Sequence, residues 1–238
     1  RPAPAGPGRV PVLRPAGGGA LRRRGLLWSG HLARCRAGRE VVAAAGPQPG
    51  PREGREERRE PVDDRGQQPI VEFDGNGKYV RSFGAGMFGR AHGMRIGPDG
   101  SIWATDVQGH TVMKFSPGGE LLLTLGTRGQ PGAWDEAAGT RLLYEPADIG
   151  FGPGGDVFVV EGHGRGEGRV LRFDRSGKFI ASWGGKGKGP GQFDQPHSIL
   201  VTADNRLLVA DRENRRVQVF DLDGKYLTEW KFNGLPCG

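Results

Sequence analysis

A repeated unit of four short apolar segments constrains this 238-residue chain more than any other feature. Three complete copies and one partial copy can be laid over one another, at residues 92–126, 147–184, 197–230 and, in part, 70–84. In each complete copy the second segment ends in an acid, at Asp106, Glu161 and Asp211, which gives a repeat length of 55 and then 50 residues. Four-stranded antiparallel units of about 40 to 50 residues are typical of β-propeller blades. The repeat therefore predicts an all-β propeller.

Turn residues separate the segments at the same places in each copy. The first and second segments are joined by PDG at 98–100, GGD at 154–156 and DN at 204–205, and these residues favour tight hairpins. The longest apolar runs, such as 121–123 and 157–160, are far shorter than the roughly 18 to 20 residues that a membrane-spanning helix needs. We therefore expect short strands and no membrane span.

Residues 1–64 differ in composition from the rest of the chain. Gly, Ala, Pro and Arg fill 41 of the first 60 positions, and no helical or strand period persists there. Such a composition buries too little apolar surface to offset chain entropy, so we expect a disordered segment over 1–64 and a partial propeller over 65–238. The first 60 residues carry a net charge of +8 and the remainder −1. The basic character of the whole chain therefore gives no reason to expect a nucleic-acid partner.

The sequence VADRENRRVQVFD at 209–221 resembles an NHL repeat, and this resemblance covers about residues 65–230. It implies an NHL-type six-bladed β-propeller. The chain supplies about three and a half blades, which predicts an incomplete propeller whose missing blades come from the rest of the protein or from another chain. An open arc of blades leaves strand edges unpaired, and such edges favour association.

His92, Ala147 and His197 occupy the same position of the repeat, at the start of the innermost strand. Two blades of a six-bladed propeller correspond to about 120° around its axis, so His92 and His197 are expected to face the central channel. A third histidine would complete a three-histidine zinc site with an open fourth position. Alternatively, the two histidines pack at the channel mouth or bond to backbone carbonyls. The repeat alone is consistent with both interpretations.

Three stretches, at 90–115, 191–201 and 209–220, resemble the peptidyl-α-hydroxyglycine α-amidating lyase domain of peptidylglycine α-amidating monooxygenases. In that family a zinc ion held by three histidines and a structural calcium lie in the channel of a six-bladed propeller, and the lyase splits a peptidyl-α-hydroxyglycine into peptide amide and glyoxylate. The resemblance implies zinc binding by His92 and His197, calcium at the backbone oxygen of Met94, and a substrate-binding arginine at Arg65. The third zinc histidine would lie beyond residue 238.

One departure from the family concerns the catalytic residue. The family has a tyrosine in an Asp-Gly-Tyr sequence after the second strand of the intervening blade, and this chain has Glu161-Gly162-His163 there. A histidine with an ordinary pKa near 6.5 suits proton transfer at neutral pH, so His163 is predicted to act as the base. The replacement is equally compatible with loss of the lyase chemistry.

The competing function class is a non-catalytic propeller that binds a peptide, a protein or a small molecule in its channel. The nearly neutral charge of the repeats makes RNA the least favoured ligand of such a scaffold. Arg212 and Arg215 are expected to belong to a polar network between strands, with substrate binding as the alternative. Secretion is compatible with the family resemblance, although the apolar residues 26–28 are too short for the core of a signal peptide.

Overall fold

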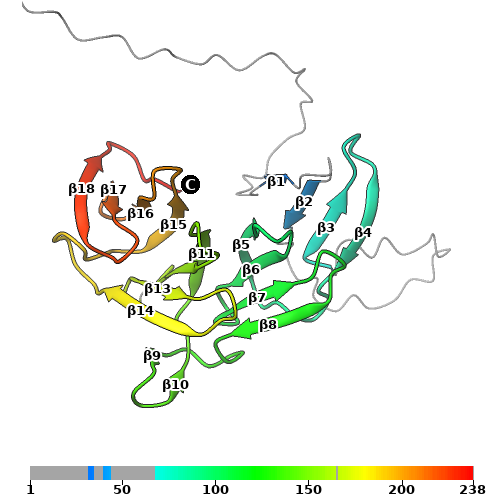
Figure 1. Cartoon of the computed structure of the whole chain (residues 1–238), viewed down its shortest axis with the longest axis horizontal. Helices are drawn as coiled ribbons and strands as arrows, with labels where there is room; N and C mark the ends of the chain where they lie inside the picture. The colour runs from blue at the N-terminus through cyan, green and yellow to red at the C-terminus, as the bar shows by residue number, and fades with distance from the viewer. Residues whose placement is uncertain (1–31, 35–39, 44–67, 165, 238) are drawn as a thin grey trace, which may run out of the picture.

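The computed structural model describes residues 32–34, 40–43, 68–164 and 166–237. Four antiparallel sheets of four strands each follow one another along the chain (Figure 1). The first sheet contains β1 (Leu32–Arg34), β2 (Glu40–Ala43), β3 (Ile70–Phe73) and β4 (Tyr79–Phe83), and the second β5 (Ala91–Ile96), β6 (Ile102–Asp106), β7 (Thr111–Phe115) and β8 (Leu121–Leu125). The third contains β11 (Pro146–Phe151), β12 (Val157–Glu161), β13 (Arg169–Phe173) and β14 (Phe179–Gly184), and the fourth β15 (Pro196–Val201), β16 (Leu207–Asp211), β17 (Arg216–Phe220) and β18 (Tyr226–Lys231). The predicted all-β propeller is confirmed.

The first sheet has two strands more than the repeat predicted. Strand β2 pairs with β3, with Val42 opposite Val71, and β1 pairs with β2. Both strands fall inside 1–64, where we expected disorder, so that expectation does not extend to these seven residues. The other residues of 1–64 lie outside the described part of the chain. The partial unit at 70–84 is thus the outer half of a four-stranded sheet, and the described residues form four such sheets where the repeat predicted about three and a half blades.

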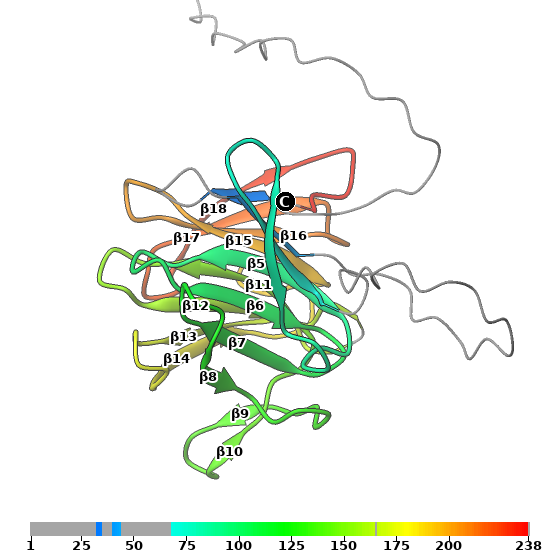
Figure 2. The same ribbon diagram turned by 90° about the vertical axis from the view of Figure 1, so that its right-hand side faces the viewer.

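The innermost strands of neighbouring sheets lie side by side. Strand β5 contacts β1 and β11, and β11 also contacts β15, so the sheets form an arc in the order of the chain (Figure 1). A short hairpin of β9 (Trp134–Asp135) and β10 (Thr140–Arg141) projects from the connection between the second and third sheets (Figure 2). Within the described ranges, no helix has the length and apolar character needed to cross a membrane.

The turns between the third and fourth strands repeat one hydrogen-bonding device. The side chains of Asp74, Asp174 and Asp221 each accept hydrogen bonds from the backbone N–H groups two and four residues further on. An aspartate that bonds the backbone in this way stabilises a turn. The repeat therefore determines where each outer hairpin closes.

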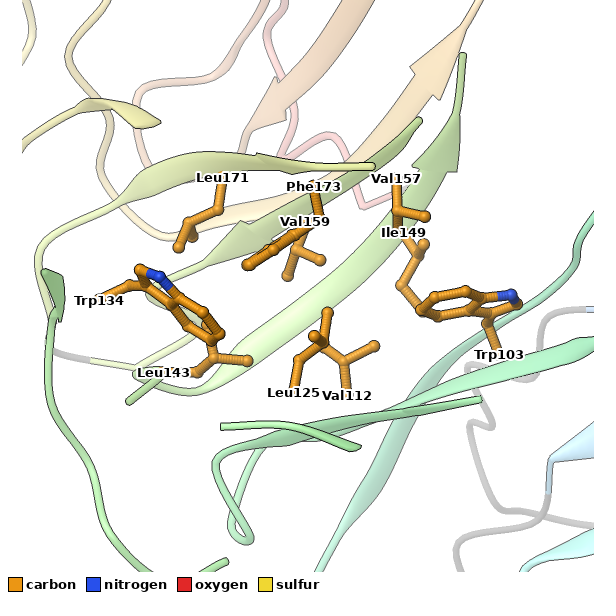
Figure 3. Packing of buried hydrophobic residues seen from close by; sticks show 10 residues of the cluster. All are labelled: Trp103, Val112, Leu125, Trp134, Leu143, Ile149, Val157, Val159, Leu171 and Phe173. Atoms are coloured by element: carbon orange, nitrogen blue, oxygen red, sulfur yellow. The ribbon is translucent and has the colours of Figure 1, made fainter. Parts of the chain in front are cut away.

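Apolar side chains fill the space between consecutive sheets. The cluster between the second and third sheets includes the indole of Trp103, close to Ile149, and that of Trp134, whose ring centroid lies 4.9 Å from that of Phe173 (Figure 3). A second cluster joins the third and fourth sheets, and a third joins the first and second. Because every cluster takes side chains from two sheets, the packing fixes the position of each innermost strand relative to the next.

The last sheet keeps one apolar face exposed. Leu200 and Trp230 lie on the face of this sheet that points away from the third sheet, and they are 57% and 49% exposed. On the third sheet the corresponding face carries Phe158 and Val160, which are fully buried against the fourth sheet. The fourth sheet therefore presents a surface of the kind that a further sheet covers elsewhere in this fold.

Candidate metal centre

A bulge begins each of the three innermost strands that carry the repeat. The pairing register shifts between Ala91 and Met94 in β5 and between Pro196 and Ser198 in β15. The same shift occurs between Pro146 and Asp148 in β11. His92, Ala147 and His197 sit inside these bulges. A bulge re-aims the side chain it contains, which explains why these positions leave the sheet ladder and face the centre of the arc.

The acid that ends the second strand anchors the loop before each bulge. The carboxylate of Asp106 accepts hydrogen bonds from the backbone N–H groups of Gly89 and Arg90, both at 2.7 Å. Asp211 accepts one from the N–H of Asp194 at 2.7 Å, and Glu161 one from that of Tyr144 at 3.0 Å. The repeating acids are therefore structural, and they hold the segments that lead into the bulges.

Three imidazoles meet at one place. His92 from β5, His197 from β15 and His163 from the loop after β12 each offer a ring nitrogen, and these nitrogens all lie within 4.8 Å of one another. The ring centroids are 4.5 Å apart for His92 and His163, 4.7 Å for His92 and His197, and 5.0 Å for His163 and His197. Three imidazoles at this spacing are a ligand set that suits zinc.

Hydrogen bonds identify the tautomers of two of these rings. Nδ1 of His92 lies 2.8 Å from the carbonyl oxygen of Ala147, and Nδ1 of His197 lies 3.1 Å from that of Cys237. A carbonyl oxygen only accepts hydrogen bonds, so the proton of each ring is on Nδ1 and the lone pair is on Nε2. Metal-binding histidines are usually oriented in this way. The carbonyl bonds of the purely structural interpretation are thus present, and they leave the rings prepared for metal binding.

Gly162 brings His163 into the cluster. It adopts φ +101°, and a Cβ atom there would come within 2.9 Å of the Cα of Gly168. Its N–H donates to the carbonyl oxygen of Tyr144 at 2.9 Å, and the N–H of His163 donates to that of Glu145 at 3.2 Å. The loop is therefore held at its backbone, with a conformation that a glycine accommodates best.

The surroundings of His163 favour its neutral form. Burial, then the two neighbouring imidazoles, then the positive charges of Arg90 and Arg212 lower the pKa of His163 from 6.5 to about 3. Arg90 is exposed, whereas Arg212 is partly buried, and its Nε is a buried donor with no hydrogen-bond partner among the described residues. Two guanidinium groups beside the imidazoles make the centre attractive to an anion.

The sequence predicted some residues of this centre and missed others. The structure brings His92 and His197 together as the repeat suggested, and it places His163 in the same cluster instead of at a separate position. Arg65 lies outside the described residues. Arg90 was missed, although its place two residues before His92 in the sequence was a usable signal. His110 does not join the cluster, because its Nδ1 accepts a hydrogen bond from the N–H of Glu145.

The calcium ion expected at the backbone oxygen of Met94 would lie beside a positive charge. That oxygen accepts a hydrogen bond from Nη1 of Arg95, whose Nη2 lies 2.6 Å from Oδ2 of Asp148. Oδ1 of Asp148 is buried without a hydrogen-bond partner in the described part of the chain, but the neighbouring guanidinium already balances the charge of this carboxylate. A second cation at this position would be repelled by Arg95, while the side chain of Met94 packs between the first and second sheets.

Comparisons with known proteins agree with this architecture. A family described as a 6-bladed β-propeller matches residues 156–237. The peptidyl-glycine alpha-amidating monooxygenase of Mus musculus is 41% identical over 175 residues, which are 68% of this chain and 17% of that protein. A probable peptidyl-alpha-hydroxyglycine alpha-amidating lyase of Caenorhabditis elegans is 35% identical over 147 residues, 60% of this chain and 40% of that protein. This chain is a β-propeller that resembles the amidating lyases in sequence.

A further sequence relative has no lyase in its name. Human NHL repeat-containing protein 3 is 36% identical over 135 residues, 55% of this chain and 38% of that protein. A solved streptogramin B lyase superposes with a TM-score of 0.57 at 16% identity, covering 85% of this chain and 54% of the other, which supports the fold alone. The amidating-lyase-like chain thus spans less than half the length of each of the three sequence relatives.

Proposed function

We propose that this propeller cleaves a peptidyl-α-hydroxyglycine at a zinc ion held by its channel histidines. The observation that carries the proposal is the convergence of His92 and His197, whose Nδ1 atoms donate to backbone carbonyls and whose Nε2 atoms therefore carry lone pairs. These are the two histidines that the resemblance to the amidating lyases matches with zinc ligands. When bound there, zinc acts as a Lewis acid toward an oxygen of the substrate.

The arginines beside the cluster suit the substrate. A peptidyl-α-hydroxyglycine ends in a carboxylate, and Arg212 has a buried Nε that lacks an acceptor among the described residues. Arg90 adds a second positive charge near His163. A carboxylate that accepts from the Arg212 guanidinium would satisfy this buried donor and orient the hydroxylated carbon toward the histidines.

The reaction is a lyase step without oxidation or reduction. The bond between the amide nitrogen and the hydroxylated carbon breaks, the hydroxyl oxygen becomes the aldehyde oxygen of glyoxylate, and the hydroxyl proton is balanced by the proton gained at the departing nitrogen. The residues of this chain bind the carboxylate and hold the substrate against the histidine cluster, so their contribution is mainly to orientation.

The experiment incubates the zinc-loaded chain with a short peptidyl-α-hydroxyglycine and measures glyoxylate and peptide amide. We expect equal amounts of the two products, and a rate at least about 100-fold lower for His92→Ala and His197→Ala, because a metal ligand is lost in each. Arg206→Gln is the control, since Arg206 is exposed and pairs with Asp204 at the surface. No product above the metal-free background would contradict the proposal.

A non-catalytic ligand-binding propeller is the second candidate. The observation in its favour is that His163 stands where the amidating lyases have their catalytic tyrosine. In that case a peptide with a C-terminal carboxylate binds the centre and is released unchanged. Binding without turnover, measured by calorimetry with the same peptidyl-α-hydroxyglycine, would favour this function over the lyase.

A further inference from the structure

We infer that His163 is a metal ligand, and that His92, His163 and His197 form a three-imidazole site for zinc or a similar divalent transition metal within this one chain. The inference rests on metal binding by His92 and His197, as the proposed function does, but not on any lyase chemistry. It differs from the sequence prediction, which assigned His163 to proton transfer and placed the third ligand beyond residue 238. The three ligands would come from three consecutive sheets.

The distances favour ligation. With Zn–N bonds of about 2.0–2.1 Å and tetrahedral angles, neighbouring donor nitrogens lie about 3.3 Å apart. The nitrogens of the three rings already lie within 4.8 Å of one another. Each ring therefore needs to move by roughly 1 Å or less to reach a common ion, which small side-chain rotations achieve. The fourth position stays available to water or to a substrate oxygen.

The same distances exclude a role for His163 as a base that faces His92 and His197 from the other side of a bound substrate. The ring centroid of His163 lies 4.5 Å from that of His92 and 5.0 Å from that of His197. These are separations of aromatic rings in direct contact, so no substrate atoms fit between His163 and the other two rings. His163 is beside the two imidazoles, where a third ligand belongs, and not opposite them.

The backbone keeps His163 in this place. The hydrogen bonds from Gly162 and His163 to the carbonyl oxygens of Tyr144 and Glu145 tie the loop to the segment just before β11. That segment continues into Ala147, whose carbonyl oxygen accepts the hydrogen bond from His92. His92 and His163 are thus positioned by one stretch of three residues, 145–147, which gives the cluster a common support.

The experiment measures metal binding by the full chain, with zinc in equilibrium dialysis and with Co²⁺ absorption as a report of coordination. All variants carry Cys237→Ser, because a thiol is itself a metal ligand and Cys237 is near the site. Its thiol is exposed, and its carbonyl oxygen accepts a hydrogen bond from His197. We expect one metal ion per chain with a tetrahedral Co²⁺ spectrum. His163→Phe and His163→Gln should each weaken zinc binding by more than about 100-fold, as His92→Ala does, whereas Arg206→Gln at an exposed surface position should not.

Two variants at position 163 keep the test sound, because phenylalanine preserves ring packing and glutamine preserves polarity. Circular dichroism and thermal unfolding of the metal-free variants show whether each is folded. Zinc affinity unchanged within about threefold in both folded variants would overturn the inference. One zinc bound through all three histidines without glyoxylate release would contradict the proposed function and leave this inference standing. Glyoxylate release by a His163→Phe protein that retains its zinc would contradict this inference and support the proposed function.

Discussion

Nδ1 of His92 donates a hydrogen bond to the carbonyl oxygen of Ala147, the residue that holds the same repeat position one sheet further along the chain. The hydroxyl of Thr105 reaches the same carbonyl oxygen at 3.1 Å and accepts a hydrogen bond from the N–H of Gly93 at 2.7 Å. One small polar group thus connects the bulge of β5 to the bulge of β11. The orientation of the first imidazole depends on the position of the neighbouring sheet.

The first prediction concerns this connection. Thr105→Val keeps the shape of the side chain but leaves the buried N–H of Gly93 without its acceptor, so the free energy of unfolding should fall by about 1–3 kcal/mol. Denaturant unfolding measures the change. Thr124→Val, at an exposed position on β8, is the matched control and should change stability by less than about 0.5 kcal/mol. Equal effects of the two substitutions would show that the Thr105 hydroxyl contributes nothing specific.

The second prediction concerns the substrate carboxylate. Arg212→Gln removes the guanidinium that has the buried, unpartnered Nε, so KM for a peptidyl-α-hydroxyglycine should rise by about 10-fold or more. Zinc content should stay the same, because Arg212 is not a ligand. Arg206→Gln serves as the control, since Arg206 is exposed and pairs with Asp204 at the surface. A KM unaffected by Arg212→Gln would remove this residue from the substrate site.

The third prediction concerns Arg95. Its guanidinium balances Asp148, which also accepts hydrogen bonds from Ser198 and from the N–H of Ile199. Arg95→Met should destabilise the chain by about 3–5 kcal/mol, because it leaves a buried carboxylate without its partner, and Arg95→Met with Asp148→Asn should recover part of the loss. Thermal unfolding of the unaltered chain should be the same with calcium and with a calcium chelator. A rise of several degrees in the unfolding temperature with calcium would instead support a calcium ion at Met94.

The fourth prediction concerns the exposed face of the fourth sheet. Leu200 and Trp230 lie on a face of the fourth sheet whose counterpart on the third sheet is covered by the fourth, so the isolated chain should associate through this face. Leu200→Lys with Trp230→Lys should shift sedimentation toward the monomer. Ile180→Lys, at a position on the outermost strand β14 that is 46% exposed, is the control and should leave association unchanged. A monodisperse monomer before any substitution would show that the face needs no cover.

The repeat predicted most of the fold because the residues that recur in it have a structural role in every sheet. The acids at 106, 161 and 211 recur because each anchors the loop before an innermost strand, and the turn aspartates recur because each closes a hairpin. Strands β1 and β2 escaped prediction because they have only three and four residues within a Gly- and Arg-rich background. Seven residues in two pieces are too short to establish an apolar alternation.

The candidate site was predicted in part for a related reason. His92 and His197 follow the repeat, so their shared direction could be deduced from the sequence alone. His163 lies in a loop whose course depends on the φ of Gly162 and on two hydrogen bonds to residues 144 and 145, and no periodic pattern encodes that course. Arg95 was unexpected for the same reason, since only the folded arrangement shows a guanidinium between Met94 and Asp148.

The carbonyl groups that orient His92 and His197 belong to the segments next along the chain, Ala147 in the third sheet and Cys237 after the fourth. His92, which is oriented by the neighbouring blade, binds metal well only while the two blades keep their spacing. By thermodynamic linkage, an ion bound at the centre must then strengthen adhesion between the blades to the same degree. The metal centre would thus also hold neighbouring blades together. Pulling the blades apart with a force probe should require more work in the metal-bound protein than in the metal-free protein.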